Sequence, residues 1–100
     1  MQKHDEFDTK LYIAMHPARR EILLHLANSK TYANRLADEL KLNTKVVQFH
    51  LSMLEKYGLV KSEFGLETPR EGRPVAVRFY VLAKDGKDVV TSISRMTRPS

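Results

Sequence analysis

The sequence predicts a single, mainly helical α+β domain over residues 1–100, built from four helices, a two-stranded β-hairpin and a closing helix. Two observations carry this prediction. Up to residue 58 and again after residue 83, apolar residues recur at intervals of three and four, as they do on one face of a helix. Residues 75–82 are instead rich in β-branched and aromatic side chains, which favour strands. Independent domains run from about 50 to about 200 residues, so we expect one core.

The first two helices are expected to meet at a proline. Residues 5–15 carry apolar side chains at helical spacing. His16 is disfavoured in helical backbone because it precedes Pro17, whereas the fixed φ of Pro17 suits the first turn of a second helix over residues 17–27. His16 is therefore expected to serve the junction between the two helices. A short extended stretch should follow at residues 30–32.

A helix-turn-helix unit is expected over residues 33–57. Asn43 or Thr44 can cap its second helix, and Gly58 ends that helix. By helical phase, the inward side of the second helix carries Val47, His50, Leu51 and Leu54. His50 is therefore expected to be a core histidine and not a metal ligand or a catalytic base.

The remaining residues predict a hairpin and a last helix. Apolar and charged residues alternate over residues 60–67, and residues 75–82 form the second strand, so the hairpin spans 60–82. The connection at 68–74 is too long and too rich in proline for a tight turn, so it should project as a mobile loop. Residues 83–96 then close the chain as a helix.

The order of these elements indicates how the chain would bind DNA. A helix-turn-helix followed at once by a hairpin places its second helix in the major groove, which is about 12 Å wide and admits one α-helix. The hairpin loop then reaches the flanking backbone or the minor groove. The outward side of the second helix carries Thr44, Lys45, Gln48, Phe49 and Ser52.

These outward residues have different expected roles. Lys45 and Gln48 suit contacts to phosphates or base edges, and glutamine can pair bidentately with adenine. Both residues would also fit an ordinary solvated helix face. Phe49 would either touch a thymine methyl group or pack under the hairpin.

Arginines extend the predicted DNA-binding surface onto the hairpin. Arg70 and Arg73 lie in its loop, where the negative potential of the minor groove favours arginine, although a solubilising loop is the alternative. Arg78 lies in a strand and faces either DNA or water. Residues 41–100 hold eleven Lys and Arg against six Asp and Glu, whereas residues 1–40 hold six of each, so the whole net charge of +5 comes from the later part.

Composition and sequence patterns argue against an enzyme, a membrane protein and a metal-binding protein. The chain has no cysteine, and it has neither a Ser/His/Asp set nor a glycine-rich phosphate loop, so we do not expect an enzyme. No apolar signal segment opens the chain and no apolar run approaches the roughly 20 residues that span a bilayer, so we expect a cytoplasmic protein without a membrane partner. His4 and Asp8, with Asp5 or His16, are suited to zinc or nickel, but we expect no metal site and no other cofactor.

Three segments resemble the arsenical-resistance-regulator (ArsR-like) class of winged helix proteins, namely HPARREILLHL at 16–26, LADELKLNTKVVQFHLSMLEKYGLV at 36–60 and GRPVAVRFYVL at 72–82. The resemblance implies a winged helix-turn-helix fold and a transcriptional regulator, with residues 44–57 as recognition helix and 68–74 as wing. It also implies a dimer built from the helices at 1–15 and 83–97. Lys41 stands where the class often has glycine, so a left-handed Lys41 would cost about 1 kcal/mol.

Two further comparisons refine this resemblance. The segment LAKDGKDVV at 82–90 also resembles the junction between strand and last helix in multiple-antibiotic-resistance-type regulators. Metal-sensing members of the ArsR-like class use cysteines, or histidine and carboxylate ligands on the last helix. This chain has no cysteine and no histidine after His50, so we do not expect metal sensing at those sites.

The residues themselves also favour a homodimer, because the first and last helices carry apolar stripes that one small domain is not expected to cover. The stripes consist of Phe7, Leu11 and Met15 on the first helix and of Val89, Ile93 and Met96 on the last. The sequence therefore predicts a homodimeric regulator that binds double-stranded DNA. Two alternatives stay open: a winged-helix module that binds protein in a larger assembly, and a repressor that responds to a small-molecule effector of unknown identity.

Overall fold

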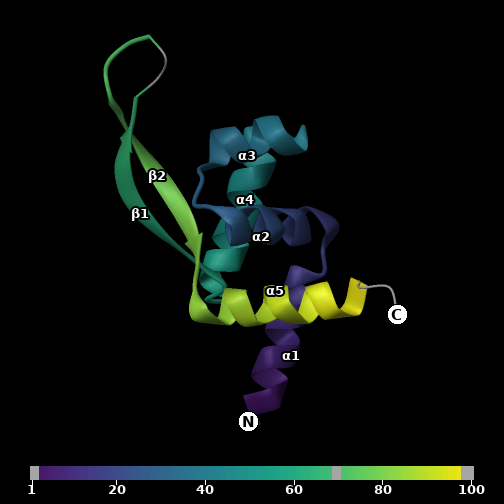
Figure 1. Ribbon diagram of the computed structural model, residues 1–100. Helices are drawn as coiled ribbons and strands as arrows, with labels where there is room; N and C mark the ends of the chain where they lie inside the picture. Colours follow the sequence, from purple (N-terminus) through teal and green to yellow (C-terminus); the bar gives the residue numbers. More distant parts are fainter. Residues whose placement is uncertain (1–2, 69–70, 98–100) are drawn as a thin grey trace.

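Residues 3–68 and 71–97 are described by the computed structural model, in which the helices gather into one body and a long hairpin leaves it (Figure 1). The elements follow the order α1 Lys3–Ala14, α2 Pro17–Asn28, α3 Ala33–Leu40, α4 Thr44–Lys56, β1 Val60–Glu67, β2 Val75–Leu82 and α5 Lys84–Thr97. The predicted, mainly helical α+β fold is confirmed, and every expected helix and strand is present.

A proline and a histidine form the junction between α1 and α2. Pro17 occupies the first turn of α2, where its missing N–H group removes no helical hydrogen bond. The Nδ1 atom of His16 accepts a hydrogen bond from the backbone N–H of Ala18 at 3.1 Å and so caps the helix. The expected role of His16 at this junction is confirmed.

The turn between α3 and α4 contains a left-handed residue that is not glycine. Lys41 has φ 56° and ψ 46°, and the N–H of Leu42 donates to the carbonyl of Ala37 at 3.0 Å, which ends α3. The side chain of Asn43 then accepts from the N–H of Lys45 at 2.7 Å and caps α4. This turn lets α4 run across α3 (Figure 1).

The hairpin is attached to the helices at its base only. β1 and β2 pair antiparallel from Val60 opposite Leu82 to Glu67 opposite Val75. Thr31 extends the sheet by a short bridge, because its N–H donates to the carbonyl of Tyr80 at 3.3 Å and its carbonyl accepts from the N–H of Tyr80 at 2.7 Å. This bridge confirms the extended stretch expected before α3. The distal half of the hairpin projects away from the body (Figure 1).

The core lies between the helices and the base of the hairpin. Its most deeply buried side chains are those of Ile22, Leu23, Leu36, Val47, Leu51, Leu54, Leu59, Val89 and Ile93. They come from α2, α3, α4, α5 and the residue before β1, so burial of apolar surface joins these elements into one unit. A Cβ atom at Gly86 would lie 2.0 Å from the carbonyl oxygen of Leu59, so α5 can approach the start of β1 only because residue 86 has no side chain.

Two residues of the stripe predicted for dimerisation on α5 are covered within the protomer itself. Val89 and Ile93 are 0% and 1% exposed, because α5 packs its apolar side against the other helices of the same protomer. Phe7 and Leu11 on α1 are likewise partly buried against this core. A second copy of the chain would therefore meet fewer of the predicted residues than their spacing in the sequence indicates.

Candidate nucleic-acid interface

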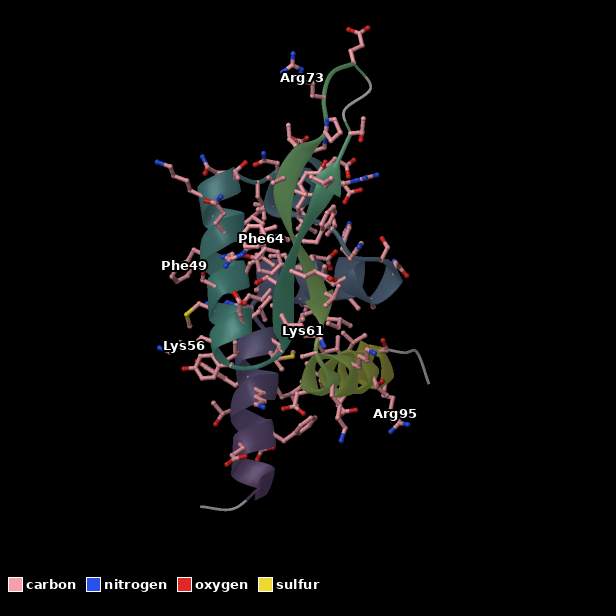
Figure 2. All side chains as sticks on the ribbon, turned by 90° about the vertical axis from the view of Figure 1, so that its left-hand side faces the viewer. Phe49, Lys56, Lys61, Phe64, Arg73 and Arg95 are labelled. Atoms are coloured by element: carbon pink, nitrogen blue, oxygen red, sulfur yellow. The ribbon has the colours of Figure 1, made fainter. Side chains whose placement is uncertain are left out.

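The expected division of α4 into an inward and an outward side is present in the structure. The inward residues predicted from helical phase are all buried. The outward residues Lys45, Gln48, Phe49 and Ser52 are exposed, and Thr44 in the first turn is half-buried. Since α4 lies beside the hairpin at the surface of the body, its outward side is accessible along several turns (Figure 2).

His50 holds α4 against the junction of α1 and α2. It is buried, and its Nδ1 atom accepts a hydrogen bond from Nε of Arg19 at 3.2 Å. Arg19 also donates to the carbonyl of Ile13 at 3.2 Å, and the ring centroids of His16 and His50 are 4.6 Å apart. Burial, followed by the charges of His16 and Arg19, lowers the pKa of His50, which suits a neutral ring that accepts at Nδ1. The predicted core histidine is confirmed.

Phe49 lies on the outward side of α4 without cover from the hairpin. Its side chain is 57% exposed and points away from β1 and β2 (Figure 2). The centroids of the Phe49 and His50 rings are 5.5 Å apart in an edge-to-face arrangement. The Phe49 ring is thus oriented by a contact with a residue of the same helix. The alternative in which Phe49 packs under the hairpin is therefore wrong, because α4 turns this position to the opposite side.

A hollow of about 410 Å³ separates α4 from β2. Gln48 and Ser52 line it from α4, and Arg78 lines it from β2. Its remaining lining residues are Tyr32, Ala33, Asn34, Val77 and Tyr80. Arg78, for which the sequence left two orientations open, therefore lies next to the polar part of the outward side of α4.

Three arginines were predicted on the hairpin, and the structure describes two of them. Arg73 is exposed at the far end of the hairpin, away from the helices (Figure 2). Arg78 lies nearer the base, where its guanidinium carbon is 5.4 Å from the centroid of the Phe64 ring on β1. Arg70 lies outside the described residues.

Sequence reasoning did not single out Phe64. Its ring is 75% exposed and stands directly across from Arg78 in the register of the hairpin. The signal that could have found it is the equal length of the two strands, since pairing Val60 with Leu82 brings positions 64 and 78 opposite each other.

The residues considered for a metal site lie near the start of the chain. The side chains of His4 and Asp5 lie outside its described part. Among the side chains that it does describe, no group of three or more His, Cys, Asp or Glu is placed to hold a metal ion. Over the same residues, no helix combines the length and the apolar character needed to cross a membrane.

A comparison with protein families matches the helical part of the chain. Residues 16–62 match the family described as bacterial regulatory protein, arsR family. This part of the chain is therefore similar to ArsR-family regulatory proteins. The matched range contains α2, α3 and α4, so it includes both helices of the helix-turn-helix unit. The resemblance found in the sequence segments is confirmed.

Solved structures share the whole fold of this ArsR-like chain. HlyU from Vibrio cholerae N16961 superposes with a TM-score of 0.73 at 22% identity, covering 97% of this chain and 98% of that chain. A regulator of the MarR family from Enterococcus faecalis V583 gives 0.75 at 20% identity, covering 96% and 83%. YodB from B. subtilis gives 0.73 at 16% identity, covering 89% and 83%. No curated protein sequence matches the chain.

Proposed function

We propose that this ArsR-like chain binds double-stranded DNA sequence-specifically as a homodimer and thereby regulates transcription. In this proposal α4 lies in the major groove and the hairpin lies on the flanking backbone or in the minor groove. The observation that carries the proposal is the accessible side of α4, where Lys45 is exposed and where Gln48 and Ser52 line a hollow together with Arg78. One α-helix fills a major groove of about 12 Å, so these side chains would face base edges and phosphates.

The outward side chains of α4 suit different chemical groups on DNA. The amide of Gln48 offers one donor and one acceptor group, the pair that recognises adenine in the major groove. Lys45 in the first turn, with Thr44 beside it, suits phosphates or a guanine edge. The exposed ring of Phe49 suits the methyl group of thymine, the apolar feature of the major groove. Base recognition is thus assigned to α4.

The arginines of the hairpin would contribute positive charge to DNA binding and would not recognise bases. Arg73 lies on its loop, where a guanidinium group can follow the backbone or enter a narrow minor groove, and the sequence predicts the same role for Arg70. Arg78 would contact the backbone closer to α4. Since contacts to phosphates carry no sequence information directly, these arginines would strengthen binding to every duplex.

A homodimer is proposed through the surface that α1 and α5 leave uncovered. The two helices of one protomer are joined by an ion pair between Lys10 and Asp85. Tyr12 on α1, Met15 directly after α1 and Met96 on α5 remain exposed. These helices lie at the opposite end of the molecule from the hairpin loop, so pairing there would leave both copies of α4 free (Figure 1).

Binding to a duplex of random sequence, measured by gel shift at increasing salt concentration, tests the proposed function. We expect the logarithm of the affinity to fall linearly with the logarithm of the salt concentration, because bound lysines and arginines release counterions from the phosphates. Lys45→Ala should weaken binding, whereas Lys87→Ala removes the same charge from α5 and should leave it unchanged. Absence of salt-sensitive binding in the wild type would instead favour the alternative of a module that binds protein.

A further inference from the structure

The pair formed by Phe64 and Arg78 stands out because each residue is unusual in its place. Phe64 is a large aromatic residue that the fold leaves 75% exposed, on a part of the hairpin that covers no core. Arg78 is exposed as well, and it forms no ion pair with any other residue that the structure describes. Packing of the protomer therefore does not account for an aromatic ring at position 64.

The geometry between the two side chains is that of a cation–π contact. The residues are direct partners in the antiparallel register, so their side chains emerge on the same face of the hairpin. The guanidinium carbon lies 5.4 Å from the ring centroid, within the roughly 6 Å over which a ring attracts a cation. The contact keeps the charge and leaves the N–H groups of the guanidinium available to a further acceptor.

The position of this pair relates it to α4. Arg78 also lines the hollow whose other wall is formed by Gln48 and Ser52. Its charge is therefore held between the proposed base-contacting side of α4 and the hairpin, where a DNA strand leaving the major groove would pass. Arg73, in contrast, lies on the loop at the far end.

We infer that Phe64 is a positioning residue: its ring holds the Arg78 guanidinium in place to bind a backbone phosphate next to α4. This inference rests on the proposed DNA-binding function and assigns a role within it. A long side chain that is fixed before binding loses less conformational entropy when it meets its phosphate. Arg78 is thus the anchor with fixed geometry next to α4.

A double-mutant cycle on duplex binding tests the inference. Phe64→Leu keeps an apolar side chain but removes the aromatic face, and should weaken binding about 2- to 5-fold without changing the salt slope. Arg78→Ala should weaken binding and flatten that slope by about 1, since one phosphate contact is lost. In the Arg78→Ala background, Phe64→Leu should have no further effect. Phe64→Tyr retains an aromatic face and should bind as the wild type does.

Leu66→Ala is the matched control, because Leu66 is 70% exposed on the same face of β1 and should leave affinity unchanged. Unaltered thermal unfolding of each variant would exclude a change in the fold. If Phe64→Leu weakens binding equally with and without Arg78, then Phe64 touches DNA itself and the positioning role is wrong. No effect of Phe64→Leu in either background would overturn it as well.

A measurement without DNA separates this inference from the proposed function. In the free protein, the ring current of Phe64 should shift the NMR signals of the Arg78 side chain, and Phe64→Leu should abolish that shift. A wild type that shows the ring-current shift but no salt-sensitive duplex binding would contradict the proposed function alone. A wild type that binds duplex but lacks the shift would contradict the role of Phe64 alone.

Discussion

At the residue scale, Arg19 and His50 connect the proposed recognition helix to the rest of the protomer. Arg19 donates to His50 on α4 and to the carbonyl of Ile13 at the end of α1, so one guanidinium joins three helices. The bond requires a lone pair on Nδ1 of His50 and is therefore made only by the neutral ring in the tautomer protonated at Nε2. This hydrogen bond between α2 and α4 thus depends on the protonation state of His50.

The lowered pKa of His50 predicts how stability depends on pH. In the unfolded chain a histidine titrates near pH 6.5, and the folded state binds this proton less readily. The free energy of unfolding should therefore be highest above about pH 6.5 and fall as the pH decreases below it. Urea unfolding at about pH 7.5 and about pH 5.5 measures this difference.

His50→Gln isolates the contribution of this residue, because glutamine retains a hydrogen-bond acceptor without a titrating ring. The variant should lose less stability between the two pH values than the wild type does. His25→Gln, on α2 and outside this network, is the matched control and should keep the wild-type difference. An identical pH dependence of the wild type and His50→Gln would show that the titration of His50 is not coupled to folding.

Replacing Gln48 or Arg73 by alanine should impair DNA binding in two different ways. Gln48→Ala should cost about 1–3 kcal/mol on the preferred duplex and little on random duplex, with the salt slope unchanged, because a base-edge contact is lost. Arg73→Ala should weaken binding to all duplexes similarly and flatten the slope by about 1, because a phosphate contact is lost. Affinities for both duplexes, measured over a series of salt concentrations, distinguish the loss of a base-edge contact from the loss of a phosphate contact. Equal weakening on all sequences by Gln48→Ala would remove α4 from the role of base reader.

At the element scale, the turn between α3 and α4 stores strain that a glycine would relieve. Lys41 adopts φ 56°, a conformation that costs a residue with a Cβ atom roughly 1–2 kcal/mol and glycine almost nothing. Lys41→Gly should therefore raise the free energy of unfolding by up to about 1 kcal/mol, since the greater freedom of glycine in the unfolded chain offsets part of the gain. Lys41→Ala removes the charge but keeps the strain, and should bring no such gain in urea unfolding. A destabilised Lys41→Gly variant would contradict this account of the turn.

Most of the elements could be predicted because local residues determine their ends. Pro17 starts α2, Asn43 caps α4 and Gly58, with φ 76°, follows the end of α4. Helical spacing likewise predicted which side of α4 is buried. These features depend on neighbours within a few residues, which a sequence displays directly.

The covering of apolar faces could not be predicted in the same way. Periodicity shows that α5 has an apolar side, but it does not show whether that side meets its own chain or a second copy, and Val89 and Ile93 meet their own chain. Alternation over β1 likewise does not reveal that the hairpin extends beyond the core and leaves Phe64 and Leu66 exposed. Both outcomes depend on contacts between residues far apart in the sequence.

At the scale of the whole molecule, the corrected dimer surface makes a different mutation the right test. Ile93→Asp would place a charge in the core of the protomer and unfold it. Met96 is 55% exposed, so Met96→Asp should leave the protomer folded but shift sedimentation toward the monomer, because a charge would be buried in the interface. Leu66→Asp makes the same kind of change on the hairpin and should leave the dimer intact. Sedimentation of Met96→Asp as a dimer as stable as the wild type would place the interface elsewhere.

Selection of bound duplexes from a random pool tests the central claim most directly, because one measurement reports both sequence specificity and symmetry. A homodimer that places one α4 in each of two successive major grooves should enrich a pseudo-palindrome with half-sites about 10 to 10.5 base pairs apart, or a multiple of that spacing. The same selection with Gln48→Ala should relax the preference at one position in each half-site. Failure of the wild-type protein to enrich any sequence, under salt conditions in which it binds duplex, would contradict sequence-specific recognition by α4.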